Sequence, residues 1–264
     1  MKYQGVLRKM QTELTLPINY YLMMEDSFVH MNQLLDKKIH IEFVKYQCLA
    51  CGENKKIFRQ GYCYDDFYQV PQAADWIMKP ELSKAHLDIE ERDLAYEKSV
   101  QLKPHIVYLA NSSNVKVGVT RKQQVPTRWI DQGAHEALEI VEVPNRYLAG
   151  ITEVALKEYV ADKTNWRAML KNEIKEVDLK SQRQALLQYI PEEVRQFIID
   201  DNEETHITFP VKRYPEKLKT LNLDKTPAYQ GILKGIKGQY LIFEDDTVFN
   251  VRSWEGYVVR LEIL

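Results

Sequence analysis

Two runs rich in Val, Ile and Tyr stand in the middle of the chain, on either side of a polar cluster. The first covers His105 to Ala110 and the second Val115 to Arg121, with Asn111 to Asn114 between them. β-Branched and aromatic residues favour strands, and an Asn/Ser cluster favours a turn. The pattern therefore predicts a β-hairpin with Tyr108 and Lys116 on paired strands.

The polar stretch after this hairpin ends at Pro126, which suits the first turn of a helix because its missing N–H would be unpaired there. Arg128 falls on that first turn. A partly alternating run from Ala137 to Val143 predicts a third strand. Beyond it, apolar residues recur every three or four positions and predict a second helix, with a stripe of Leu148, Ile151, Ala155 and Tyr159.

Glu153 lies on this second helix but off its apolar stripe. One turn earlier, Ala149 and Gly150 are small, so we expect open space beside the Glu153 carboxylate. A carboxylate placed in this way can reach a ligand.

The two ends of the chain carry similar patterns that predict antiparallel strands. Tyr3–Arg8 resembles Tyr229–Lys234, and Tyr21–Asp26 resembles Tyr240–Asp245. A final strand-like run follows each, Lys38 to Val44 or Tyr257 to Ile263. The repeat predicts two related β-units, which pair into one barrel or form two small barrels. Such barrels often bind oligonucleotides, and a structural cap for the central region is the favoured alternative.

The remaining segments predict helices and complete a mixed α+β fold. Residues 80–97 indicate a charged helical connector, and residues 178–200 indicate two helices split at Pro191. We expect an N-terminal β-unit over residues 1–75 and a connector over 76–103. A central domain with its trailing helices follows over 104–204, and a C-terminal β-unit over 205–264.

Composition is that of a soluble globular protein, with 45% hydrophobic and 28% charged residues in a chain of 264. The segment Met1 to Gly5 lacks the apolar core of a signal peptide, and no run of about 18 apolar residues occurs, so we expect a cytoplasmic protein. A net charge of −2 argues against a protein that coats nucleic acid nonspecifically. Dinucleotide-binding, phosphate-loop and serine-hydrolase glycine motifs are missing from the sequence.

Charge is nevertheless uneven near the C-terminus. Between Thr205 and Gly238 the sequence contains seven Lys or Arg residues and two acidic residues, which gives this range a net charge of +5. Such a run is usually a solvated face, but it could hold a phosphate backbone if it folds next to Arg128. The candidate nucleic-acid contacts are Arg121, Lys122, Arg167, Lys212 and Arg213.

The three cysteines suggest a metal site. Cys48 and Cys51 have the two-residue gap of a zinc knuckle, and Asp66 follows Cys63 at the same gap. A structural zinc site takes four tetrahedral ligands, typically from two such pairs. Either Asp66 completes a Cys₃Asp site, or the knuckle persists without its metal. The metal-free alternative is favoured because a hard carboxylate is a less common partner for three thiolates.

Two sets of motifs in the chain resemble known families. The first set is Val107–Ala110, Lys116–Arg121, Pro126–Ala134 and Asp162–Trp166. It resembles an uncharacterised bacterial family of unknown function, DUF2797, and this resemblance is long. The second set is Val107-Tyr108, Lys116–Thr120, Arg128 and Glu153, which resembles the GIY-YIG nuclease domain over about a third of the chain. Together they imply a central GIY-YIG-like α/β domain with an antiparallel sheet, flanked by the β-units.

The GIY-YIG likeness implies a metal-dependent phosphodiesterase acting on DNA or RNA. Tyr108 matches the tyrosine that helps to activate water, Arg128 the arginine that faces the phosphate, and Glu153 the glutamate that holds Mg²⁺ or Mn²⁺. Asn165 matches a later asparagine. Lys116 stands where many members have a second tyrosine, so Tyr108 or Lys116 serves as the base. An arginine fork and a divalent cation suit this chemistry because the transition state gains negative charge.

Two other interpretations remain for the same residues. The domain could bind nucleic acid without cutting it, or serve as a protein-interaction scaffold in which these residues only pack. Taken singly, Glu153 is typical of a solvated helix glutamate and Tyr108 of a strand-packing aromatic. Trp129 and Trp166 are more typical of a core than of a base-stacking platform.

Overall fold

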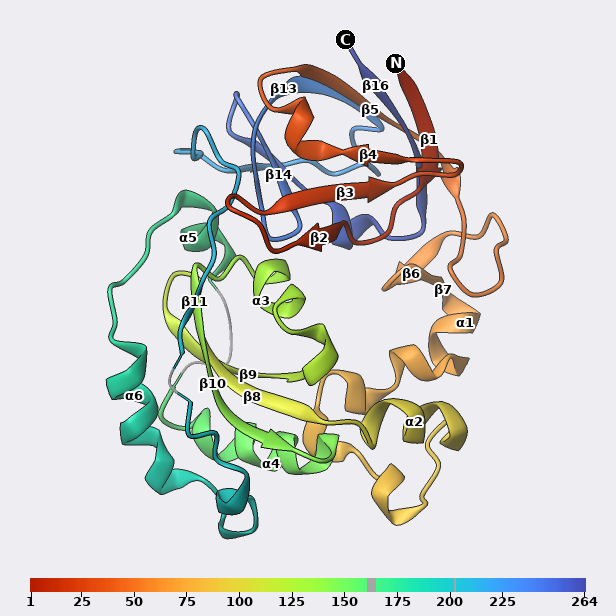
Figure 1. Cartoon of the computed structure of the whole chain (residues 1–264). Coiled ribbons are helices and arrows are strands. Elements are labelled where there is room, and N and C mark those ends of the chain that lie inside the picture. The colour runs from red at the N-terminus through yellow and green to blue at the C-terminus, as the bar shows by residue number, and fades with distance from the viewer. Residues whose placement is uncertain (161–164, 202) are drawn as a thin grey trace. The chain divides into compact units, whose positions relative to one another are not determined.

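The computed structural model describes residues 1–160, 165–201 and 203–264 (Figure 1). The chain divides into two compact units. Unit 1 contains Met1–Tyr68, Leu170–Asn172 and Ile207–Leu264, and unit 2 contains Gln69–Met169 and Glu173–His206. Asp162, Lys163 and Thr164 of the predicted Asp162–Trp166 motif lie outside the described residues. Among the described residues, no helix has the length and apolar character that crossing a membrane requires.

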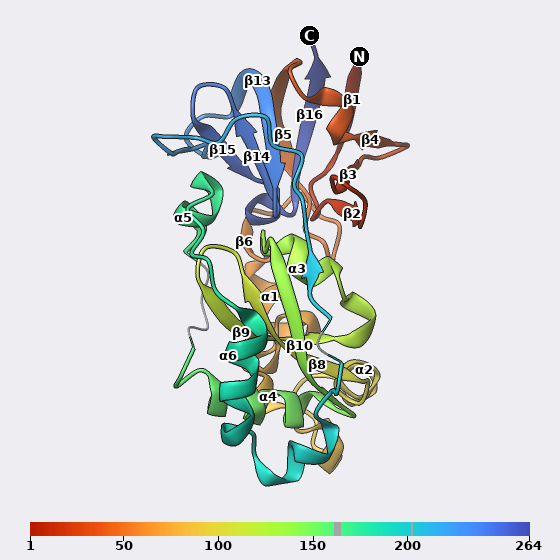
Figure 2. The ribbon, with the colours of Figure 1, turned by 60° about the vertical axis from the view of Figure 1, so that its left-hand side comes forward.

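Unit 1 is built on a seven-stranded sheet to which both ends of the chain contribute (Figures 1 and 2). Its strands, in spatial order, are β1 (Lys2–Val6), β16 (Tyr257–Ile263), β5 (Lys38–Tyr46), β13 (Ala228–Lys237), β14 (Tyr240–Phe243), β15 (Thr247–Asn250) and β12 (Lys219–Thr220). A second sheet contains β2 (Gln11–Glu13), β3 (Asn19–Met23) and β4 (Phe28–His30). A third pairs β6 (Ile57–Arg59) with β7 (Tyr62–Cys63), which leads into α1 (Tyr64–Gln69).

The prediction of barrel-like units at the two termini is corrected, because within the described residues the large sheet stays open, with β1 and β12 at its edges. Strand β5 pairs with β16 on one side and with β13 on the other, both antiparallel. Each half of the chain therefore uses the other half to cover its strand edges. Because these strand edges are already paired with the other half, neither terminal half forms a closed barrel of its own.

Unit 2 is built on a four-stranded sheet in the order β11 (Thr205–His206), β10 (Glu136–Val143), β8 (His105–Asn111) and β9 (Val115–Arg121). The predicted hairpin is confirmed, since β8 and β9 pair antiparallel. The remaining helices are α2 (Leu94–Gln101), α3 (Thr127–Asp131), α4 (Arg146–Leu156), α5 (Trp166–Lys171) and α6 (Leu179–Leu186). Alternate residues of β8 face opposite sides of the sheet. Val107 and Leu109 pack into a core with Ala149 and Leu156 of α4, whereas Tyr108 packs on Trp129 of α3.

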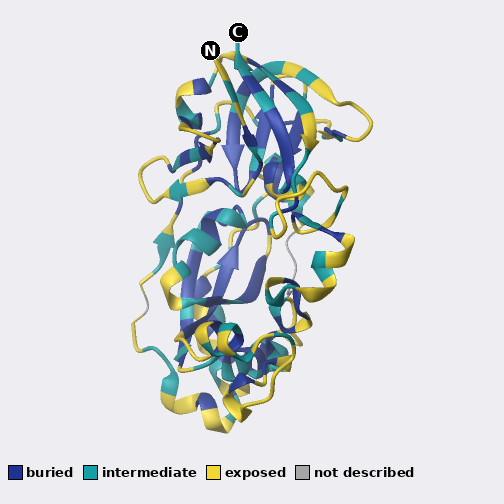
Figure 3. Cartoon of the chain, turned by 90° about the vertical axis from the view of Figure 1, so that its right-hand side faces the viewer, coloured by how far each residue is buried: buried dark blue, intermediate teal, exposed yellow. Residues whose placement is uncertain are grey.

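Burial follows this layering, and Figure 3 shows the strands largely in the buried colour with exposed residues on the outer turns. Every residue of β8 is buried. The predicted apolar stripe of α4 is only partly right, because the helix ends at Leu156 and Tyr159 beyond it is 51% exposed. The prediction is wrong for Tyr159 because the helix ends before the apolar spacing in the sequence does.

The predicted helical connector over residues 80–97 is corrected to short turns. Pro80–Leu82 and Ala85–Leu87 are single 3₁₀ turns, and an α-helix begins only at Leu94. The second turn stops at Asp88, whose φ of 58° is left-handed and cannot continue a helix. The split at Pro191 is confirmed, since α6 and a following 3₁₀ turn precede it and Glu192–Phe197 forms a separate 3₁₀ segment.

Candidate functional site

Tyr108 and Gly118 are directly paired on β8 and β9, and the tyrosine ring covers the glycine. A β-carbon built on Gly118 would lie 2.7 Å from the Tyr108 hydroxyl oxygen, so only glycine leaves room for the ring. The Tyr108 side chain is fully buried, and its hydroxyl donates a hydrogen bond to Gln132 Oε1 at 3.1 Å. Burial raises the pKa of Tyr108, and the nearby positive charge of Arg128 opposes that rise. Tyr108 is therefore held as a neutral phenol beneath the site.

Arg128 lies in α3, whose first turn follows Pro126 as predicted, and Gln132 is the residue that caps the C-terminal end of this helix. Four residues apart, they share one face of the helix. Lys116 lies on the same face of the hairpin as Gly118 and is 5% exposed. These three side chains line one cavity of unit 2.

Helix α4 brings a second set of side chains to this cavity. Arg146, Gly150, Glu153 and Lys157 follow at spacings of four, three and four residues and so form one stripe. The expectation of open space at Gly150 is wrong: a β-carbon there would lie 2.2 Å from the backbone nitrogen of Glu81. The 80–81 backbone crosses the helix at this glycine because no side chain is in the way. Glu153 nevertheless lines the cavity.

The cavity has a volume of about 390 Å³ and carries a surplus of positive charge. Five basic and two acidic side chains line it, so its electrostatic character favours an anion. The charged lining residues are Lys79, Lys116, Arg128, Arg146 and Lys157, with Glu81 and Glu153 opposing them.

Arg146 was not anticipated from the sequence, and two backbone carbonyls hold its guanidinium in place. Its Nε donates to the carbonyl of Trp76 at 3.2 Å and its Nη2 to that of Ile77 at 2.8 Å. Its guanidinium also lies 5.5 Å from the centre of the Trp76 ring. Burial lowers the pKa of Arg146 to about 10, while the carboxylate of Glu153 acts in the opposite direction. The seven-residue spacing from Arg146 to Glu153 was the signal that could have identified it.

Of the residues predicted to act with these, Asn165 does not line the cavity. It is exposed, and its Oδ1 accepts a hydrogen bond from the N–H of Ala168 at 3.2 Å, in the first turn of α5. This is the ordinary geometry of an N-cap.

The predicted nucleic-acid contacts also lie outside the cavity lining. Within unit 2, Arg121 Nε donates to Gln124 at 3.3 Å, Lys122 pairs with Glu142 at 2.7 Å, and Arg167 stacks on Trp166 at 4.3 Å. In unit 1, Lys212 pairs with Asp36.

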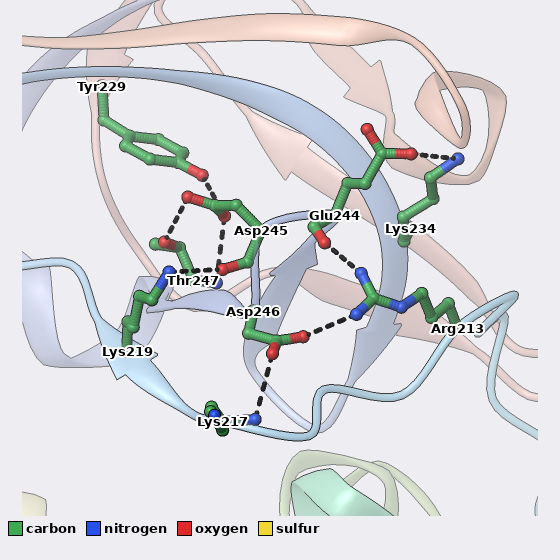
Figure 4. Close-up of polar contacts among 9 residues, drawn as sticks. All are labelled: Arg213, Lys217, Lys219, Tyr229, Lys234, Glu244, Asp245, Asp246 and Thr247. Atoms are coloured by element: carbon green, nitrogen blue, oxygen red, sulfur yellow. Dashed lines mark hydrogen bonds and ion pairs between the residues drawn. The ribbon is translucent and has the colours of Figure 1, made fainter.

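Part of the basic run of unit 1 is paired with acidic groups, several of them on the β14–β15 turn (Figure 4). Arg213 pairs with Asp246 at 3.0 Å, and Lys234 pairs with Glu244 at 3.2 Å. Lys219 Nζ donates to the carbonyl oxygen of Asp245 at 3.0 Å. The net charge counted along the sequence therefore overstates the positive field of this surface.

Lys237 is not part of any exposed patch, because it is only 1% exposed. Its Nζ donates to Asn172 Oδ1 at 2.9 Å and lies 5.5 Å from the ring centres of both Phe209 and Tyr214. Burial lowers the pKa of Lys237 from 10.5 to about 8. The prediction that counted Lys237 in a basic run able to hold a phosphate backbone is therefore corrected.

Lys237 is expected to make stability depend on pH. Between pH 8 and 10.5 the unfolded chain binds a proton that the folded chain does not, so the free energy of unfolding rises with pH. This group contributes up to about 1.4 kcal/mol per pH unit in that window. Urea unfolding at each pH from 7.5 to 10.5 measures the free energy of unfolding. This free energy should rise less steeply with pH for Lys237→Met than for the wild type, and the control, the exposed Lys225→Met, should follow the wild type. Equal slopes for Lys237→Met and the wild type would contradict the assignment.

The cysteine cluster is a separate candidate site in unit 1. The ligand atoms of Cys48, Cys51, Cys63 and Asp66 all lie within 4.8 Å of one another, a set that could hold a metal ion. The thiol of Cys48 donates to Asp66 Oδ2 at 2.9 Å and that of Cys63 at 3.1 Å. These bonds hold the pKa of Asp66 well below its usual value, and the bond to Asp66 raises the pKa of Cys51 to about 12.

Comparison with known proteins gives one match. The model of a family described as "Protein of unknown function (DUF2797)" matches residues 36–259, which is most of the chain. Neither the curated proteins nor the solved structures contain a match.

Proposed function

The chain belongs to the DUF2797 family, and we propose that it is a metal-dependent phosphodiesterase acting on nucleic acid. The observation that carries this proposal is the convergence of Lys116, Arg128 and Glu153 from β9, α3 and α4 on one cavity. These residue types are the ones expected for hydrolysis of a phosphodiester: cations for the phosphoryl oxygens and a carboxylate for a divalent ion. The resemblance of the sequence motifs to the GIY-YIG domain suggests the phosphate-facing role of Arg128 and the metal-holding role of Glu153.

A hard cation fits the donors present. Glu81 and Glu153 both line the cavity, and Mg²⁺ and Mn²⁺ commonly take one or two carboxylates together with substrate phosphate. When bound, such a cation would neutralise charge on the phosphoryl oxygens. Glu153 would hold it, and Arg128 and Arg146 would bind the remaining oxygens of the phosphate. Arg146 costs little to order for this task because two backbone carbonyls already fix it.

We assign the proton acceptor to Lys116 rather than to Tyr108. Lys116 lines the cavity, whereas the Tyr108 hydroxyl is buried beneath Gly118 and its pKa is raised. In the reaction, water would attack phosphorus and pass a proton to Lys116 in its unprotonated form, and the P–O bond to the leaving group would break. The leaving oxygen would take its proton from solvent.

Hydrolysis of labelled DNA and RNA oligonucleotides, single- and double-stranded, with Mg²⁺ or Mn²⁺ tests this proposal. Arg128→Ala should lower the rate about 100- to 1000-fold, the usual loss when one transition-state donor is removed. Arg195→Ala is the control, because Arg195 is an exposed arginine of the same unit that does not line the cavity. A wild-type rate for Arg128→Ala, or no hydrolysis of any substrate, would refute the proposal.

A second function, nucleic-acid binding without cleavage, is favoured by the inaccessibility of Tyr108. The hydroxyl is already engaged by Gln132, so a residue that the family likeness assigns to water activation is not open to a substrate. Binding without turnover in the same assay, lost in Arg128→Ala, would identify this alternative.

A further inference from the structure

The segment 47–69, which we call the knuckle segment, has almost no apolar core of its own. Its buried residues are Cys48, Gly61 and Cys63, and the aromatic side chains of Phe58, Tyr64 and Tyr68 are exposed. Its only sheet is the two-stranded β6–β7 pair, and a two-stranded sheet is marginal in water. Small units with so little core usually need a covalent or metal staple.

The four candidate ligands of this segment have the spacing of a tetrahedral centre. Four donors bound to one Zn²⁺ at about 2.3 Å lie about 3.8 Å apart. The corresponding atoms here are all within 4.8 Å of one another, and Asp66 Oδ2 approaches two of the sulfurs at 2.9 and 3.1 Å. The four donor atoms are therefore already close enough together to share one metal ion.

The backbone around the cysteines is arranged to support this position. The N–H of Gly52 donates to the Cys48 carbonyl at 2.9 Å, which closes the turn that brings Cys51 back toward Cys48. Gly52 has a φ of 75°, which favours glycine. The N–H of Cys63 donates to Cys48 Sγ at 3.2 Å, so the second ligand pair is fixed to the first. Such bonds to ligand atoms orient them and support a metal site.

We propose that Cys48, Cys51, Cys63 and Asp66 bind one Zn²⁺ and that this ion holds the knuckle segment folded. Three sulfur donors favour zinc over Mg²⁺ or Mn²⁺, which prefer oxygen. Four protein ligands leave no position for a substrate, so the site is structural. This assignment reverses the expectation from the sequence that the knuckle persists without metal, and it does not depend on the phosphodiesterase activity.

The test begins with zinc analysis of the purified full-length protein by mass spectrometry, where about one Zn²⁺ per chain is expected. Cys51→Ser should weaken retention against a chelator by at least about tenfold, since even outer-shell changes cost about 10- to 100-fold. Cys51 is exposed, so its replacement removes no core side chain. The matched control is Asp65→Ala, an exposed carboxylate beside Asp66 in the first turn of α1, which should retain zinc.

Titration with Co²⁺ gives a second measurement that does not require a folded loss-of-ligand variant. The wild type should show sulfur-to-cobalt charge-transfer absorption, and Asp66→Cys should show a stronger band because a fourth thiolate is added. Absence of both zinc and the cobalt band from the wild type would overturn the site, as would full zinc retention by Cys51→Ser.

Limited proteolysis tests whether the zinc ion holds the knuckle segment folded. Removal of zinc should increase proteolytic cleavage within residues 47–69 more than elsewhere in the chain. Unchanged cleavage of this segment after the metal is removed would overturn the proposed role of the ion as a staple.

Discussion

Glu153→Ala is expected to abolish metal-dependent hydrolysis while leaving the fold and oligonucleotide binding in place. The carboxylate is the proposed anchor of the cation, and loss of about 4 kcal/mol of transition-state stabilisation corresponds to about a thousandfold in rate. Binding should survive or tighten, because removing Glu153 leaves five basic side chains against one acidic side chain in the cavity. The measurements are single-turnover hydrolysis with Mn²⁺ and fluorescence anisotropy of the same oligonucleotide.

Glu158→Ala is the matched control for this variant, because Glu158 is exposed five residues later and does not line the cavity. Its rate should equal that of the wild type. If Glu153→Ala cleaves as fast as Glu158→Ala, the carboxylate has no part in the chemistry. If Glu153→Ala also loses binding while remaining folded, Glu153 supports the cavity rather than the metal.

Local periodicity predicted the parts of the site that are close in sequence. The β8–β9 hairpin, the start of α3 after Pro126 and the strand β10 all follow from patterns spanning a few residues. Such patterns can be recognised in the sequence because backbone geometry fixes the repeat of side chains along strands and helices. Arg128 and Glu153 could therefore be placed on the correct elements before their partners were known.

The parts that the sequence did not predict depend on contacts between distant segments. The approach of Glu81 to Gly150 joins residues about seventy positions apart, and no local pattern encodes it. The pairing of β16 with both β1 and β5 likewise decides between an open sheet and a barrel, although the repeat of the two ends was visible. Lys237 shows the same limit for charge, since the sequence places it in a basic run while its own side chain is buried.

Gly150→Ala is expected to destabilise unit 2, although alanine is normally the better helix residue. In an open helix position this change would stabilise by about 0.5 to 1 kcal/mol. Here the new β-carbon would lie 2.2 Å from Glu81 N and 2.4 Å from Pro80 C, and these are backbone atoms that cannot rotate away. Forced overpacking of this kind costs about 1 to 3 kcal/mol, so the sign of the effect reverses.

Urea unfolding measures this change, and Ala155→Gly in the same helix calibrates the intrinsic difference between the two residues. Displacement of the 80–81 backbone should also impair the cavity, because Lys79 and Glu81 line it and Arg146 is fixed by the nearby carbonyls of Trp76 and Ile77. We therefore expect Gly150→Ala to lower both stability and hydrolysis, whereas Ala155→Gly lowers stability alone. A stabilised Gly150→Ala would mean that the 80–81 segment does not rest against α4 in solution.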